Sequence, residues 1–331
     1  MRSSQDGRDR RVPLLLPFYI TLHSLHAFLL FPSICVFVVS LTPPPPGSAR
    51  VSLGYMSLVG VSSYFLWTQK GQTILPLVRG SGFLLRFKQQ GTFYHYHVIT
   101  AAHVSCPVRY RGLYGDSVGF KAIGERHVSA RMLTPHAETH QVQHALDMEF
   151  RQHYMPNVDV AALRCRDEAQ LDGLRLAPFE VDEKPIEDGT ELVYCGFDAI
   201  EERANPNDDG LTLREVRLDG TCKAAIVSLD YGTVLAGSID SLSDDERAQG
   251  KQMPLSLSGG PVLRKSTGKV VGVVAARIMK NAPPRDPHAG TLYQDPYLDL
   301  SENVSLHQRW PLDVAFVPIG EFYNSLCRSE M

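Results

Sequence analysis

Several features that would point to a partner are missing from this sequence of 331 residues. There is no sustained basic stretch and the net charge is −3, so nucleic acid is not an expected partner. No Cys-x-x-Cys pair occurs among the six cysteines, which argues against a zinc ribbon. No segment repeats at a fixed period. The hydrophobic content of 44% is ample for the core of one or two domains.

The cysteines are thinly spread along the chain. Cys35 lies in an apolar N-terminal segment, which leaves an odd number, five, in the rest. Such a distribution is typical of buried thiols rather than of a disulfide framework. It favours a reducing compartment.

The first 48 residues read as a hydrophobic leader or anchor followed by a linker. Residues 12–41 are apolar, follow a basic stretch, and exceed the ~20 residues that span a bilayer. The prolines in this segment would break or kink a helix. Residues 42–48, TPPPPGS, are typical of a stiff linker.

Three readings of this leader stay open, one of them an atypical transit peptide, against which Asp6 and Asp9 argue. If the leader is part of the protein, the protein is membrane-anchored or secretory, with membrane association through residues 12–41. If Met56 is the true start, the protein is intracellular.

From about residue 72 onward, short apolar or alternating runs recur between Gly, Pro, Asn and Asp. This spacing of many short strands favours an all-β sandwich or barrel. The expected strands are 80–87, 93–103, 158–165, 190–197, 213–220, 223–229, 259–264 and 269–278, with a last strand and a short closing helix within 311–326.

Two other kinds of segment interrupt the strands. Residues 136–153 are expected to be helical, which would place His136, His140 and His144 on one face. We interpret that face as solvated rather than as a metal site. Residues 238–252 and 280–299 are expected to be surface loops.

Three short motifs carry a candidate chemistry. VITAAH ends a predicted strand at His103, and NVDVAAL places Asp159 in an apolar strand, where a carboxylate needs a hydrogen-bond partner. SLSGG then provides Ser258 beside two glycines that permit close backbone approach. A serine nucleophile requires a base and a buried acid that orients the base.

In this order, TAAH, DVAAL and SGGPV resemble the chymotrypsin-type (trypsin-like or HtrA-like) serine peptidases, with GSGF at the start of the region. The resemblance covers residues 72–327. It implies an all-β fold of two six-stranded antiparallel β-barrels, at about 72–170 and 185–320, with a short C-terminal helix. It implies hydrolysis of polypeptides without a cofactor or metal.

The resemblance also implies a role for each matching residue. His103 would be the general base, Asp159 would orient it, and Ser258 would form an acyl-enzyme. The backbone N–H groups of Ser256 and Ser258 would form the oxyanion hole. The substrate cleft would be lined by Gln252, Ala275, Ala276 and Arg277.

The sequence departs from the family at the serine motif. Ser256 stands where the family usually has glycine, so its peptide is expected to flip more readily and remove an oxyanion donor. Leu257 replaces an aspartate that pairs with a freed N-terminus, which argues against activation by cleavage. The alternative function is therefore an impaired pseudoprotease that binds peptides or proteins. A lipase or esterase is disfavoured because its residue order would be Ser, Asp, His.

Overall fold

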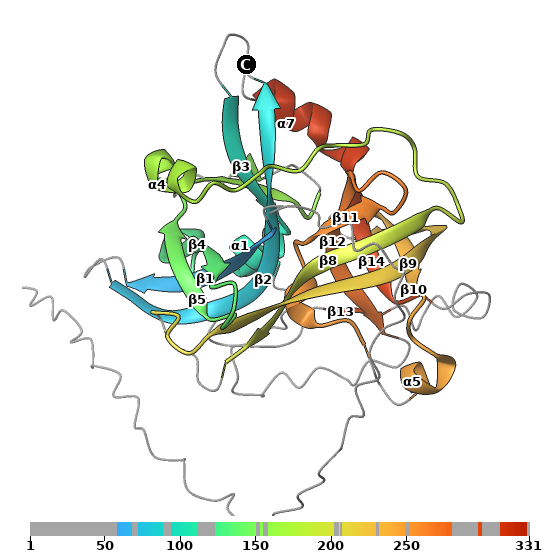
Figure 1. The fold of residues 1–331 in the computed structure, drawn as a ribbon, viewed down its shortest axis with the longest axis horizontal. Coiled ribbons are helices and arrows are strands. Elements are labelled where there is room, and N and C mark those ends of the chain that lie inside the picture. The colour runs from blue at the N-terminus through green and yellow to red at the C-terminus, as the bar shows by residue number, and fades with distance from the viewer. Residues whose placement is uncertain are drawn as a thin grey trace, which may run out of the picture. The chain divides into compact units, whose positions relative to one another are not determined.

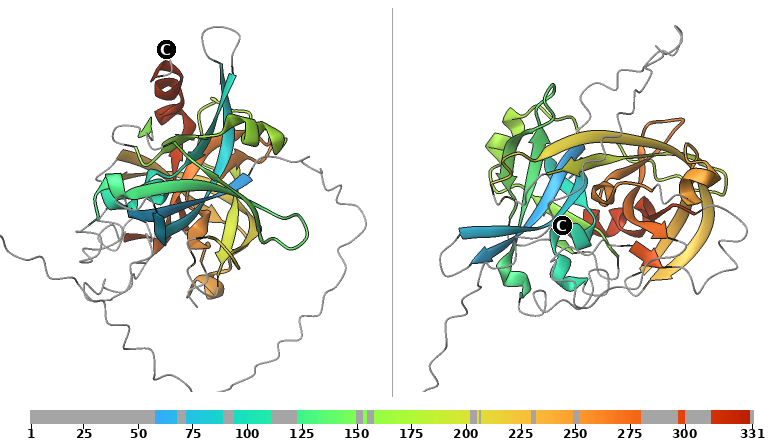
Figure 2. Two further views of the ribbon diagram at one scale, coloured as in Figure 1. Left: turned by 90° about the vertical axis from the view of Figure 1, so that its left-hand side faces the viewer. Right: turned by 90° about the horizontal axis from the view of Figure 1, so that it is seen from below.

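The structure is a computed structural model (Figures 1 and 2). It describes residues 58–67, 72–88, 94–110, 123–149, 153–154, 158–201, 205, 207–229, 232–248, 252–279, 297–299 and 312–329. The predicted leader at 1–48 lies outside these residues. In the part of the chain described, no helix is long and apolar enough to cross a membrane.

The N-terminal half of the described region forms a seven-stranded antiparallel sheet, drawn in blue to green in Figure 1. Its order is β5-β4-β1-β2-β3-β7-β6. An isolated bridge between Met148 and Cys165 brings β5 and β7 together beyond their ends. The strands are β1 (Leu58–Trp67), β2 (Gln72–Lys88), β3 (Tyr94–Thr100), β4 (Val128–Pro135), β5 (Val142–Asp147), β6 (His153–Tyr154) and β7 (Ala161–Arg164).

The C-terminal half forms a second sheet, in the order β11-β8-β9-β10-β14-β12-β13. Pairing of β11 with β12 closes six of these strands into a barrel, and β13 adds to β12 in parallel. The strands are β8 (Glu191–Ile200), β9 (Thr212–Leu229), β10 (Gly232–Ile239), β11 (Pro261–Arg264), β12 (Val270–Met279), β13 (Tyr297–Asp299) and β14 (Val314–Pro318). The all-β prediction is confirmed.

Short helices connect the strands, and the last one closes the chain as predicted. They are α1 (Ala102–Ser105), η1 (Pro107–Arg109), η2 (Glu125–His127), α4 (Glu168–Gly173), α5 (Asp244–Ala248), η3 (Leu255–Leu257), η5 (Ile319–Glu321) and α7 (Tyr323–Ser329). Two of them, α1 and η3, carry the candidate site.

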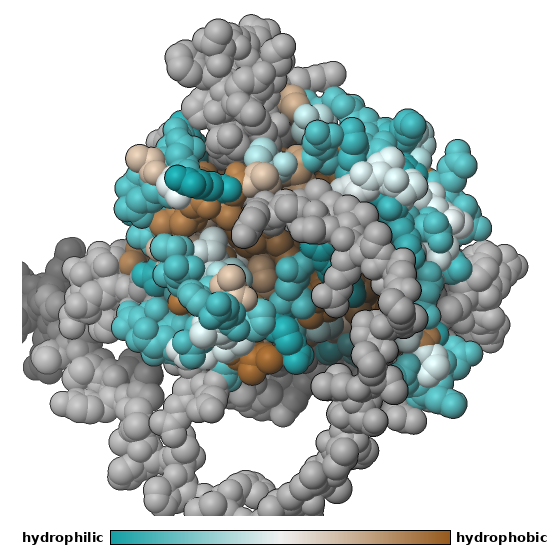
Figure 3. Space-filling view, in the orientation of Figure 1, coloured by the Kyte–Doolittle hydropathy of each residue, from teal (hydrophilic) through white to brown (hydrophobic). Residues whose placement is uncertain are grey.

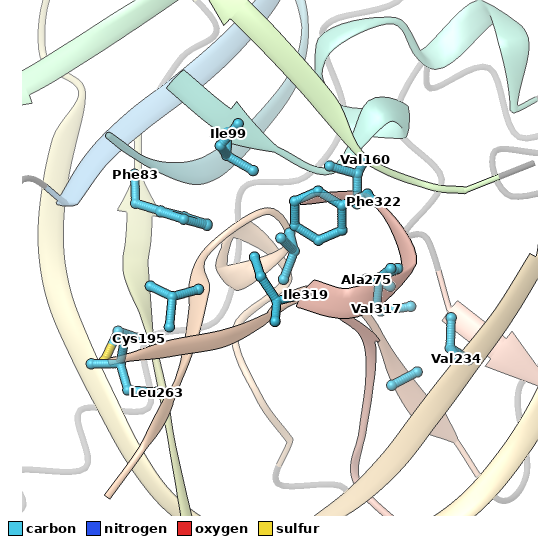
Figure 4. Close-up of a cluster of buried hydrophobic side chains, with 14 of the residues drawn as sticks. Phe83, Ile99, Val160, Cys195, Val234, Leu263, Ala275, Val317, Ile319 and Phe322 are labelled. Carbon is cyan, nitrogen blue, oxygen red and sulfur yellow. The ribbon is translucent and has the colours of Figure 1, made fainter. Parts of the chain in front are cut away.

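The two sheets share a hydrophobic core. One buried cluster lies within each sheet, and two others draw residues from both, the smaller of them joining Leu133 to Phe197 and Leu213. In Figure 4, Phe83 and Ile99 of the first sheet face Leu263 and Val317 of the second, with Phe322 from the C-terminal segment beside them. Burial of these side chains stabilises the contact between the sheets, because each removes apolar surface from water.

The predicted helix at 136–153 is wrong. Residues 136–141 form the turn after β4, residues 142–147 form β5, and His153 begins β6. In the β4–β5 hairpin, Arg131 pairs with Asp147 and Thr134 with His144. Cross-strand pairing decides the structure here, because the segment has a poor apolar stripe for a helix. Its three histidines consequently do not share a helix face, and His136 Nδ1 accepts backbone N–H groups within the connecting turn.

Sequence reading missed six of the described strands, which are β1, β4, β5, β6, β10 and β13. Of these, β5 and the start of β6 lie in the predicted helix, and β13 lies in the predicted loop 280–299. Strand β1 lies before residue 72, and Val59, Val61, Ser62, Ser63 and Tyr64 within it are all buried. A strand buried on both faces lacks the apolar and polar alternation by which a strand is recognised. Residues 213–229 were expected to form two strands and are continuous in β9.

The surface is largely polar on the face shown in Figure 3, where apolar residues gather near the middle of the view. Ile200 is the exposed large hydrophobic residue among those described, at 46% of its full exposure. A single such residue does not mark a docking surface.

Candidate active site

His103 lies in α1, which begins directly after β3 ends. Strand β3 stops at Thr100, Ala101 is extended, and α1 starts at Ala102. Both alanines and His103 are fully buried. The small side chains of the two alanines let the backbone turn inside the core and place the His103 imidazole there.

Asp159 holds His103 by two hydrogen bonds. The His103 Nδ1 and Asp159 Oδ2 atoms lie 2.6 Å apart, and the His103 backbone N–H donates to Asp159 Oδ1 at 2.9 Å. Asp159 is 2% exposed, so these donors offset the cost of burying its charge. Because a carboxylate only accepts, the ring carries its proton on Nδ1 and Nε2 is the basic nitrogen.

Ser258 follows η3 in a turn that contacts both sheets. Its backbone oxygen accepts from the Ser81 N–H of β2 at 2.8 Å. Its Oγ donates to the Ala275 carbonyl of β12 at 3.3 Å, and the residue is 2% exposed. The nucleophile candidate is therefore fixed at the junction of the two sheets.

The two glycines after Ser258 are required by close packing. Gly259 has φ +88°, and a Cβ there would lie 2.2 Å from both Ser81 O and Thr100 Oγ1. A Cβ on Gly260 would lie 1.9 Å from Cys195 O. The Ser258 turn thus packs against Thr100 and Ala101, the residues that lead into His103. His103 in turn is hydrogen-bonded directly to Asp159.

The two residues predicted to form an oxyanion hole, Ser256 and Ser258, lie in a closed turn. Within η3, the Ser258 N–H donates to the Leu255 carbonyl at 3.1 Å. One of the two expected donors is therefore paired inside the turn. Leu257 is fully buried in the core of the second sheet and anchors the turn by packing.

The predicted cleft residues lie on either side of this turn. Gln252 is half-buried just before η3, and Ala275 and Ala276 are buried on β12 within the core shared by the sheets. Arg277 is half-buried and pairs in register with Val314 of β14 and Tyr297 of β13. Of the four, Ala275 touches Ser258 directly.

Sequence reasoning missed Ser81, which joins the sheets at this site. Its Oγ donates to the Ser256 carbonyl at 2.6 Å and accepts from the Phe197 N–H of β8 at 2.8 Å. The only signal was its place between two glycines in GSGF, and that pattern does not reveal contacts more than 100 residues away.

A buried ion cluster lies two residues from Ser81. Arg79 Nη1 contacts Asp208 Oδ1 at 2.5 Å, Arg79 Nη2 contacts Glu201 at 2.9 Å, and Tyr64 donates to Asp208 at 2.6 Å. Burial acts to lower the pKa of Arg79, but Tyr64 and the two carboxylates outweigh it and raise the pKa. The cluster ties the first sheet to the segment between β8 and β9.

Two largely antiparallel β-sheets that share a core, one of them closed into a six-stranded barrel, are typical of the chymotrypsin-type fold. Residues 80–273, more than half of the chain, match the trypsin-like peptidase domain. The chain therefore belongs to the trypsin-like peptidase family.

The chain is similar to neuropsin, a serine protease expressed in the limbic system of mouse brain, with 12% identity and a TM-score of 0.43. The match covers 82% of this chain and 94% of that one. No curated protein matches the chain.

Proposed function

We propose that the protein is a serine endopeptidase that cleaves polypeptides through His103, Asp159 and Ser258. The observation that carries the proposal is the double hydrogen bond between His103 and Asp159, at 2.6 and 2.9 Å. It orients a buried imidazole beside the strand end against which the Ser258 turn packs.

Each residue has one chemical task in this mechanism. His103 Nε2 takes the Ser258 Oγ proton as that oxygen attacks the scissile carbonyl, and then passes the proton to the leaving amine. Water enters as the second nucleophile and His103 assists in the same way. Asp159 stays ionised and stabilises the imidazolium that forms twice in the cycle.

The proposed oxyanion donors are the N–H groups of Ser256 and Ser258. Each donor aimed at the developing oxyanion is worth about 3 kcal/mol of transition-state stabilisation. The Ser258 N–H must leave the Leu255 carbonyl before it can serve.

Side-chain preference would be set by Gln252 and the β12 residues. Gln252 is uncharged, so it offers no ion pair to a substrate Arg or Lys. Arg277 either favours acidic side chains or narrows the cleft.

The second candidate function is a peptide-binding module without hydrolysis. It is favoured by the closed turn, in which the Ser258 N–H is already paired.

Hydrolysis of a fluorescent protein substrate distinguishes these functions. We expect Ser258→Ala to lower kcat/KM by about 10³-fold or more and to keep its thermal unfolding midpoint. A folded wild type that binds peptides but releases no fragments would support the binding module instead.

A further inference from the structure

The side chain of Ser256 is fastened to the edge of β8. Its Oγ donates to the Phe197 carbonyl at 2.8 Å and accepts from the Ala199 N–H at 2.9 Å. The residue is 7% exposed, so water competes little for these bonds. A glycine at this position would make neither contact.

The backbone of Ser256 is held from the other sheet. Its carbonyl accepts from Ser81 Oγ at 2.6 Å, and the same Oγ accepts from the Phe197 N–H. Gly196 makes room for this arrangement, because a Cβ there would lie 2.7 Å from both Ser81 Oγ and Leu257 Cδ1. Ser256 is thus bonded to β2 and β8 at once.

These bonds hold η3 in the conformation that occupies the Ser258 N–H. The Leu255 carbonyl sits as its acceptor at 3.1 Å, in place of an external oxygen. Rotation of the Leu255–Ser256 peptide would remove this acceptor. Since the hydroxyl and carbonyl of Ser256 are both bonded to neighbouring strands, that rotation is resisted at the residue where it must occur.

We propose that Ser256 is a latch that keeps the oxyanion site of this peptidase closed until a polypeptide substrate offers its scissile carbonyl oxygen to the Ser258 N–H. The proposal rests on the proposed function, and Ser256 acts in it as a positioning residue. The substrate oxygen and the Leu255 carbonyl compete for one donor. The resting protein is therefore slow to acylate Ser258.

Two features of Ser256 keep the turn closed, its hydroxyl and its Cβ, and substitutions can remove them separately. Ser256→Ala removes the hydroxyl bonds to Phe197 and Ala199 and keeps the Cβ. Ser256→Gly also removes the Cβ. A Cβ disfavours the left-handed backbone region, which an opened turn can enter, so the glycine variant opens more easily. We expect the turn that pairs the Ser258 N–H with the Leu255 carbonyl to open more often in Ser256→Ala than in wild type, and more often again in Ser256→Gly.

Two measurements on the full chain test this order. The first is hydrogen exchange at the Ser258 amide, followed by fragmentation mass spectrometry. The second is the rate at which a fluorophosphonate probe labels the protein. Ser238→Ala is the matched control, because Ser238 is 3% exposed and its hydroxyl donates to Asp240 Oδ1 at 3.1 Å.

We expect Ser256→Ala to raise both rates by about 3–10-fold and Ser256→Gly by a further factor of about 5–10, with Ser238→Ala equal to wild type. If the Ser256 hydroxyl only stabilised the fold, its removal would lower the rate of fluorophosphonate labelling. Unchanged exchange at the Ser258 amide in both folded variants would overturn the latch. Faster exchange with no labelling of any variant would support the latch and reject the peptidase function.

Discussion

At the scale of single residues, burial decides what each polar group can do. Asp159 is 2% exposed, and the backbone N–H and the ring of one residue, His103, both bind its carboxylate. The carboxylate therefore fixes both the position and the tautomer of the imidazole.

Asp159→Asn should lower kcat by about 10⁴-fold while leaving KM within a few-fold, because an amide can donate to Nδ1 and select the wrong tautomer. Steady-state kinetics on a peptide substrate measures this, with the thermal midpoint as a check on folding. A loss of less than tenfold would show that His103 is oriented by other groups.

Gly259 and Gly189 both have positive φ, at +88° and +81°, but differ in their surroundings. A Cβ on Gly189 meets nothing within 4 Å, and one on Gly259 would lie 2.2 Å from two oxygens. Gly189→Ala should thus cost only about 1–2 kcal/mol of backbone strain, and Gly259→Ala more than about 3 kcal/mol. Urea unfolding of both variants measures the difference, and equal costs would contradict the packing of the Ser258 turn.

At the scale of elements, the sequence predicted most of the strands that carry the site. The β2–β3 hairpin, β7, β8, β11 and β12 follow from short apolar runs bounded by turn residues. Strand β1 could not be predicted in this way, because it is buried on both faces. Strand β5 could not be predicted either, because pairing with β4 overrides a weak helical pattern.

At the candidate site too, local sequence pattern predicts single residues but not the contacts between distant strands. His103, Asp159 and Ser258 could be predicted as candidates because each ends or interrupts a recognisable motif. The contacts of Ser81 and Ser256 with β8 depend on how two distant sheets meet, and local pattern carries no information about that.

Asp182 attaches the segment between the sheets to β11 and β12. Its N–H donates to the Val270 carbonyl, and its carboxylate accepts from Arg264 Nε at 2.8 Å. Burial acts to raise the pKa of Asp182, but the Lys184 N–H and Arg264 outweigh it and lower the pKa. The stabilisation is therefore complete above the unfolded pKa of about 3.9 and is lost as pH falls through the lower folded value.

The free energy of unfolding of wild type should therefore exceed that of Asp182→Asn most at pH 5–6, with the gap narrowing as pH falls below about 4. Urea unfolding between pH 2.5 and 6 measures the gap. Glu180→Gln is the control, because Glu180 pairs with Lys269 at the surface and should show little effect. A gap that is constant over this range would rule out the Asp182–Arg264 pair as its source.

At the scale of the whole molecule, the two sheets are joined by apolar packing and by charge. The shared cluster in Figure 4 supplies the packing, and Arg79 with Asp208 and Glu201 supplies a buried ionic tie. The Ser258 turn contacts Ala275 of the shared cluster and Ser81, two residues from Arg79, so the geometry of the candidate site depends on both connections.

Arg79→Ala should cost up to about 3–5 kcal/mol of unfolding free energy, because it removes the nearer charge partner of the buried Asp208 carboxylate and leaves the more distant Arg131, at 3.6 Å. Arg214→Ala is the matched control, since Arg214 pairs with Asp198 at the surface and should cost less than about 1 kcal/mol. Equal costs in urea unfolding would show that the buried cluster does not hold the sheets together.

Mapping the residue that a fluorophosphonate modifies tests the catalytic proposal most directly. Peptide mass spectrometry of the labelled wild type and Ser256→Gly proteins should place the adduct on Ser258, with none on the folded Ser258→Ala and His103→Ala proteins. An adduct on another residue, or none on any folded protein, would contradict the role of Ser258 as the attacking serine.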